Sequence, residues 1–192
     1  MTEIHLKRKI TLRRKGEAAA FTFAGRLKVK LLWQSKTDLD LCLFYKTKDG
    51  QVGGVFSDGF RQNKDDLGSL NEFPFIQHTG DDPEPAEGGE SVEQINIASL
   101  EQIDTAYVCV INYSKAIDGE SVSFAQDSGR VEITSDSGDY LEVPIDADDQ
   151  GHVYEVCSIK NQDGNNSLMN ERTVMDLGTA FDKIPGFSLI CE

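Results

Sequence analysis

The chain has 192 residues, 39% of them hydrophobic, and a formal net charge of −14 at pH 7. This length and hydrophobic content predict a single folded domain over residues 1–192 and exclude a disordered chain. The acidic excess argues against nucleic acid and anionic membranes as partners, because both repel a negatively charged surface.

Short segments of alternating apolar and polar residues, separated by Gly, Asp and Asn turns, run along most of the chain and predict β-strands. In chain order, strands are expected over residues 4–12, 18–23, 26–33, 39–45, 51–56, 94–97, 107–113, 121–126, 129–134, 140–143, 153–160 and 170–175. Residues 100–104 and 178–183 are expected to be loops or short helices. Residues 57–75 are expected to be irregular.

Two segments show the pattern most clearly. In 26–33, Leu27, Val29, Leu31 and Trp33 are expected to face one way, with lysines opposite. Residues 107–113 are nearly all apolar, which predicts a central strand buried on both faces. Because no helical period is sustained, we expect an all-β fold: a sandwich of two mainly antiparallel sheets with long acidic loops and few short helices.

The charge is unevenly distributed along the chain. Residues 1–64 carry fourteen Lys and Arg against six acids, whereas residues 65–192 carry five against twenty-seven. The basic start, at 7–9 and 13–15, is therefore expected to lie against the acidic remainder of this chain or of another. Binding of a polyanion is the less favoured alternative.

The cysteines and the N-terminus indicate the compartment. The four cysteines, Cys42, Cys109, Cys157 and Cys191, are widely spaced in apolar segments and form no C-x-x-C motif. They predict buried free thiols in a reducing cytoplasm. The polar N-terminus resembles no signal peptide, and no apolar run is long enough to predict a transmembrane helix.

The most unusual stretch runs from His78 to Ile95. Residues 81–93 contain six carboxylates: Asp81, Asp82, Glu84, Glu87, Glu90 and Glu93. No Lys or Arg occurs from 65 to 114 to balance them. A bound hard cation would offset the repulsion, since Ca²⁺ takes six to eight oxygen ligands. A solvated acidic loop is the alternative, and His78 beside it is expected to be a solvated loop residue.

A second acidic element is the sequence D-L-D-L at 38–41. In an extended segment, Asp38 and Asp40 point to the same face. Two carboxylates on one strand can hold a cation only if another segment supplies further oxygens, and the acidic loop is the expected supplier. The alternative is an Asp-rich turn that leads into a strand. Motifs typical of hydrolases, nucleotide-binding proteins and zinc proteases are absent, so we predict no catalytic activity.

Three motifs together resemble the TerD-type tellurium-resistance and stress-response family. They are L-x-W followed by D-L-D-L at 31–41, G-D-D running into E-x-I-x-I at 80–97, and N-Y-S-K-A at 112–116. The resemblance covers roughly residues 25–135. It implies a cytoplasmic bacterial β-sandwich that binds calcium and has no established enzymatic activity.

The resemblance also implies a ligand set of one or two Ca²⁺ ions, with two favoured. Its members are Asp38, Asp40, Asp81, Asp82, Glu90 and Glu93. Glu90 enters this set as a substitute, because the chain has Ser91 and Val92 where the family has two Asp before the final Glu. The C-terminal part also lacks the family's Trp-containing strand, so the chain is identified as a divergent TerD- or TerA-like member.

The leading prediction is therefore a non-enzymatic Ca²⁺-binding protein of the tellurium-resistance or general stress-response type. One alternative is an interaction module with a purely structural metal. It would assemble with other stress-response proteins through its basic N-terminal strand or a sheet edge. The other alternative is a metal-assisted hydrolase, against which the missing nucleophile–base motif counts.

Overall fold

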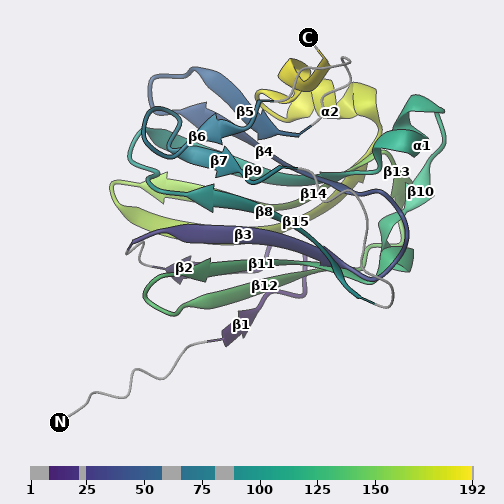
Figure 1. Ribbon diagram of the computed structural model, residues 1–192, viewed down its shortest axis with the longest axis horizontal. Coiled ribbons are helices and arrows are strands. Elements are labelled where there is room, and N and C mark those ends of the chain that lie inside the picture. Colours follow the sequence, from purple (N-terminus) through teal and green to yellow (C-terminus); the bar gives the residue numbers. More distant parts are fainter. Residues whose placement is uncertain (1–8, 22–24, 58–65, 81–88, 192) are drawn as a thin grey trace.

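The computed structural model is a sandwich of two β-sheets, which confirms the predicted fold class (Figure 1). It describes residues 9–21, 25–57, 66–80 and 89–191. The seven-stranded sheet contains, in spatial order, β1 (Lys9–Thr11), β12 (Tyr140–Ile145), β11 (Gly129–Ser135), β3 (Leu27–Trp33), β8 (Ser91–Ile97), β7 (Ile76–His78) and β6 (Gly68–Ser69). The six-stranded sheet contains β2 (Ala18–Phe21), β15 (Asn165–Met175), β14 (Val153–Gln162), β9 (Ile103–Ile111), β4 (Asp40–Thr47) and β5 (Val52–Phe56). Within these sheets β1 runs parallel to β12, and the other paired strands are antiparallel.

The main hydrophobic core fills the space between the two sheets and follows from the alternation in the sequence. The four residues of β3 that were predicted to share a face are all buried in it: Leu27, Val29, Leu31 and Trp33. β9 is the central strand that its apolar sequence predicts, since it lies between β14 and β4 and most of its residues are buried. Burial on both faces requires a second apolar layer outside the six-stranded sheet.

That layer comes from the C-terminal segment. The helix α2 (Leu177–Lys183) and the 3₁₀-helix η2 (Phe187–Cys191) cover the outer face of the six-stranded sheet. The ring centroids of Phe44 and Phe187 lie 5.0 Å apart in this second cluster. Cys42 and Cys109, opposite each other on β4 and β9, are buried here as free thiols, as predicted. Cys157 is a third buried free thiol, on the core side.

Smaller elements gather at one end of the sandwich, on the right in Figure 1. They are the helix α1 (Tyr113–Ile117), the 3₁₀-helix η1 (Phe124–Asp127) and the strand pair β10 (Val122–Ser123) and β13 (Gln150–Gly151). In the described part of the chain, no helix is long and apolar enough to cross a membrane.

Two predicted strand boundaries at this end of the sandwich are wrong. The strand over 107–113 stops at Ile111, because Asn112 caps α1 by accepting a hydrogen bond from the Lys115 N–H at 3.2 Å. The strand over 121–126 is reduced to β10 and is followed by η1. The first predicted strand is described only from Lys9, and residues 22 and 23 of the second lie outside the described residues.

The basic N-terminal segment contacts the acidic remainder of its own chain. Lys9 Nζ lies 3.7 Å from Glu142 Oε2 and 5.0 Å from the centroid of the Tyr140 ring. This pair supports the predicted contact with the acidic remainder, here within one chain, at the one residue of 7–9 that the structure describes. Because Lys9 is largely exposed, the ion pair adds little to stability.

Replacing Gly186 with alanine should destabilise the protein by about 2–4 kcal/mol. Gly186 turns the chain from α2 into η2 with φ of 87°, and a Cβ atom there would overlap the Gly53 carbonyl oxygen on β5. Gly50→Ala is the matched control, since Gly50 has φ of 88° and open space around it. It should lose only about 1 kcal/mol, as measured by urea unfolding. Equal losses in the two variants would show that the close approach to β5 is unimportant.

Candidate metal centre

The backbone of Leu41 lies where β4 extends beyond its neighbour β5. Pairing between the two strands begins with Cys42 opposite Phe56, so β5 offers no strand partner to the peptide groups of Leu41. Two side chains from the opposite sheet take its place. Glu93 Oε2 accepts a hydrogen bond from the Leu41 N–H at 2.6 Å, and His78 Nε2 lies 3.1 Å from the Leu41 carbonyl oxygen. We call Leu41, His78 and Glu93 the Leu41 clamp.

The period-two alternation of β7 and β8 places both clamp side chains inside the sandwich. Every second residue of β8 from Ser91 to Ile97 is buried, and Glu93 occupies one of these inward positions. His78 shares its face with Ile76 on β7 and pairs with Ile95 on β8. The strands that carry the two side chains are therefore neighbours, and their inward faces meet the start of β4.

Hydrogen bonding fixes the protonation of the buried imidazole. The Gly80 N–H donates to His78 Nδ1 at 2.9 Å, so the ring hydrogen is on Nε2 and is donated to the Leu41 carbonyl. The same Nε2 lies 3.6 Å from Glu93 Oε2, and neither side chain has exposed surface. The Leu41 N–H and the facing imidazole thus compensate part of the cost of burying the Glu93 carboxylate.

Asp40 contributes a second buried carboxylate at the start of β4, on the strand face opposite to that of Leu41. It is the first residue of β4 and only 7% exposed, on the same strand face as Cys42. Burial raises the pKa of the Cys42 thiol well above its ordinary value, and the negative charges of Asp40 and, more weakly, Glu93 raise it further. The charges of both carboxylates act on the Cys42 thiol, Asp40 from the strand face that carries Cys42 and Glu93 from between the two sheets. Asp38 is exposed and precedes the strand.

The acidic loop leaves the sheet at the Leu41 clamp. Gly80, the last described residue before it, is bonded to His78 of the clamp. Ser91, at the start of β8, pairs with Trp33 on β3. The predicted ligands Asp81 and Asp82 lie outside the described residues.

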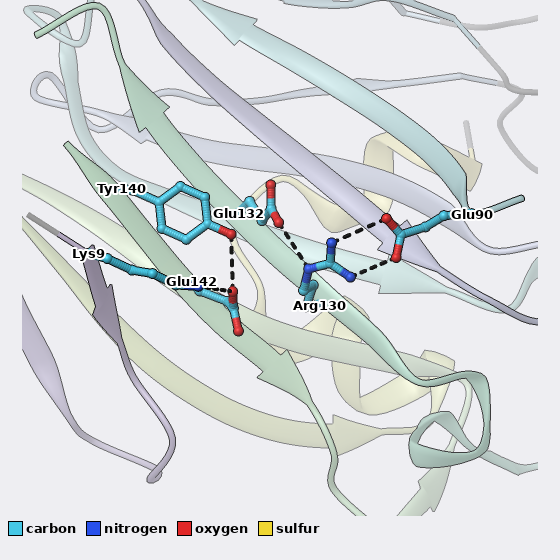
Figure 2. Close-up of polar contacts among 6 residues, drawn as sticks. All are labelled: Lys9, Glu90, Arg130, Glu132, Tyr140 and Glu142. Atoms are coloured by element: carbon cyan, nitrogen blue, oxygen red, sulfur yellow. Dashed lines mark hydrogen bonds and ion pairs between the residues drawn. The ribbon is translucent and has the colours of Figure 1, made fainter. Parts of the chain in front are cut away.

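Glu90 points toward Arg130, as Figure 2 shows. Its carboxylate forms two hydrogen bonds with the Arg130 guanidinium on β11, at 2.7 and 3.2 Å, and Arg130 also binds Glu132 at 2.9 Å. The hydrogen bond from Arg130 lowers the pKa of Glu90 below its ordinary value. The structure therefore gives Glu90 a cationic side-chain partner, and it does not bring Glu90 together with Asp40 and Glu93.

The buried carboxylates of Asp40 and Glu93 are of the chemical type that suits a hard cation. Asp40 and Glu93 would supply two oxygen ligands of the kind that Ca²⁺ prefers. Among the residues that the structure describes, no three His, Cys, Asp or Glu side chains are grouped so as to hold a metal ion. A complete calcium site would therefore need backbone carbonyls, water, or residues of the acidic loop in addition.

Sequence reasoning missed two buried polar residues at this end of the sandwich. The expectation that His78 is solvated was wrong, because it is 2% exposed. The alternation of Ile76, Gln77 and His78 was a signal that could have revealed its inward position. Asp127 was not singled out, yet it is 2% exposed and accepts a hydrogen bond from Ser35 Oγ at 2.7 Å. Its position in a 3₁₀-helix leaves no periodic signal.

Comparison of the chain with protein-family models, with curated proteins and with solved structures found no match. The resemblance to the TerD-type family therefore rests on the three sequence motifs alone, and the function that it implies stays a prediction.

Proposed function

We propose that the protein binds Ca²⁺ at the start of β4, with Asp40 and Glu93 among the ligands. The observation that carries the proposal is the contact between Glu93 and Leu41. The motifs implied that a glutamate after the acidic loop works with the D-L-D strand, and residues 52 positions apart do meet there. Asp38 and the loop residues Asp81 and Asp82 are proposed to complete the site.

Electrostatics gives the proposal its physical basis. Two buried carboxylates near one thiol repel each other, and a divalent cation beside them would offset that repulsion and their desolvation. The sequence around the site offers few cations, since residues 65–114 contain no Lys or Arg. The ion would then order the acidic loop against β4.

The wider role follows from the family resemblance. We propose a non-enzymatic, cytoplasmic protein of the bacterial tellurium-resistance or general stress response, in which Ca²⁺ stabilises the acidic end of the sandwich. Other stress-response proteins are the proposed partners.

Thermal unfolding of the chelated protein, followed by separate Ca²⁺ and Mg²⁺ titrations, tests the proposal. An ion that binds only the folded state at about a hundred times its Kd should add about 2.7 kcal/mol. We expect a rise in Tm that is selective for Ca²⁺, because the carboxylate cluster suits a larger, more flexible coordination shell than Mg²⁺ accepts. The absence of any Ca²⁺-dependent rise would refute calcium binding.

The variant Asp40→Asn should abolish most of the Ca²⁺-dependent rise in Tm by removing one negative ligand. The readout is the increment that Ca²⁺ adds, because the substitution of a buried residue changes the starting Tm as well. Asp163→Asn is the matched control: Asp163 lies in the β14–β15 turn with φ of 52°, a conformation that Asn tolerates. If Asp40→Asn responds to Ca²⁺ as the parent does, the D-L-D strand is not part of the site.

A further inference from the structure

A cleft of about 290 Å³ opens between the edges of the two sheets, away from the Leu41 clamp. Two paired positions frame it: Ile10 opposite Leu141 in the seven-stranded sheet, and Phe21 opposite Asn166 in the six-stranded sheet. Asp139, which directly precedes β12, lies at its rim. This volume is near the lower end of the range for small-molecule sites.

The unusual feature of the cleft is a polar residue at a core position. Asn166 is two residues before Leu168, which is buried in the main core, so its side chain is on the inward face of β15. It is 4% exposed, and among the described residues nothing donates a hydrogen bond to its Oδ1. A buried acceptor of this kind costs stability unless something donates to it, and Asn166 is one of the residues that line the cleft.

Asp139 adds a negative charge to the lining of the same cleft. Its backbone is fixed by the turn between β11 and β12, where its N–H donates to Ser135 Oγ at 3.2 Å and its carbonyl accepts from the Ser135 N–H at 3.1 Å. No hydrogen bond or ion pair engages its carboxylate within the described ranges. The nearby Lys9 is paired with Glu142 instead. The polar groups named so far thus offer oxygen acceptors.

These groups define the chemistry of a matching ligand. A carboxylate and an amide oxygen call for a positively charged donor, and a primary ammonium group supplies three N–H bonds. The side chains of Ile10, Phe21 and Leu141 form an apolar wall for the rest of the molecule. The space holds roughly ten non-hydrogen atoms, at about 30 Å³ each. The net charge of −14 would raise the local concentration of such a cation.

We propose that this cleft binds a small primary ammonium compound with an apolar body. The ammonium group pairs with the Asp139 carboxylate and donates to Asn166 Oδ1, while the body packs against Phe21 and Leu141. The site is separate from the proposed calcium centre, so binding persists in excess chelator.

Calorimetric titration of the chelated full-length protein with phenethylamine tests the proposal, with 2-phenylethanol as the uncharged probe. We expect phenethylamine to bind at least tenfold more tightly than the alcohol, because only the ammonium pairs with a carboxylate. Asp139→Asn should weaken phenethylamine binding at least tenfold and leave the alcohol unaffected. Asp163→Asn, which removes a carboxylate from another hairpin, should bind both probes as the parent does.

Asn166→Leu separates binding from folding. Leucine continues the apolar series of β15 and removes the unsatisfied oxygen, so this variant should keep or raise the parent Tm while phenethylamine binding weakens. If Asn166→Leu fails to fold, phenethylamine binding by Asp139→Asn alone tests the proposal. The proposal is overturned if phenethylamine does not bind the parent at about 10 mM, if it binds no better than the alcohol, or if Asp139→Asn binds it unchanged.

Discussion

Replacing Glu93 with alanine is expected to lower the free energy of unfolding by about 3–5 kcal/mol, the largest loss we predict for a single side chain. The substitution removes the acceptor of the buried Leu41 N–H at a point where β5 no longer runs beside β4. It also leaves a cavity beside His78, whose imidazole faces the carboxylate at 3.6 Å. Urea unfolding in excess chelator measures this structural loss without any contribution from a bound ion.

Glu93→Gln is the matched variant for this prediction. Its amide oxygen can still accept the Leu41 N–H, so it should lose less than half as much stability as Glu93→Ala in chelator. In Ca²⁺, however, the glutamine should behave like the alanine and lose the ion's added stability, because a neutral amide is a weaker ligand than a carboxylate. Unchanged stability of Glu93→Ala in chelator would contradict the structural role of the clamp.

Glu155→Gln is expected to stabilise the protein by about 1–2 kcal/mol at pH 8 and to have little effect at pH 4.5. Burial on β14 raises the pKa of Glu155 to about 7, and the negative charge of Glu171 adds to the rise, while Lys15 opposes it. The folded protein therefore binds this proton more tightly than the unfolded chain, whose value is 4.5. The stability from Glu155 is fully present below pH 4.5 and is lost as the pH rises through about 7.

Solvent screening limits the gain in free energy of unfolding that Glu155→Gln can give. A rise from 4.5 to about 7 would correspond to about 3 kcal/mol for a fully buried group, and Glu155 is partly exposed, so screening reduces it. Unfolding midpoints in urea at the two pH values, for the parent and the variant, measure the difference. Glu101→Gln, at an exposed turn position, is the control and should show no such pH dependence. An equal gain at both pH values would mean that ionisation of Glu155 is not the cause.

The parts of the fold that sequence reasoning predicted are those with a local physical signal. The alternation of Leu27 to Trp33 fixes which face of β3 is buried. The dipeptide Asp163-Gly164 predicts a turn, and the structure has φ of 52° and 85° there, between the paired residues Gln162 and Asn165. Two consecutive residues with positive φ are what a two-residue hairpin loop requires.

The parts that escaped prediction depend on distant contacts or on very short elements. The helix α1 spans only five residues, too few for a 3.6-residue period to show. The candidate site likewise has one feature that the sequence predicts and one that it does not. Alternation places Glu93 inward, but its bond to Leu41 exists only because β5 stops short of that residue, and strand ends are poorly signalled by sequence. The engagement of Glu90 by Arg130 likewise needs two segments 40 residues apart to lie on either side of β3.

The edge strands β1 and β2 have a consequence for how the protein is made. Lys9 of β1 pairs with Tyr140 of β12, and Phe21 of β2 pairs with Asn166 of β15. During synthesis these two strands leave the ribosome well before their partners. Until then their backbone groups have no strand to join, so the nascent chain carries two exposed edges that are open to pairing with other chains. Closure of both sheets therefore has to wait until β12 and β15 have been made.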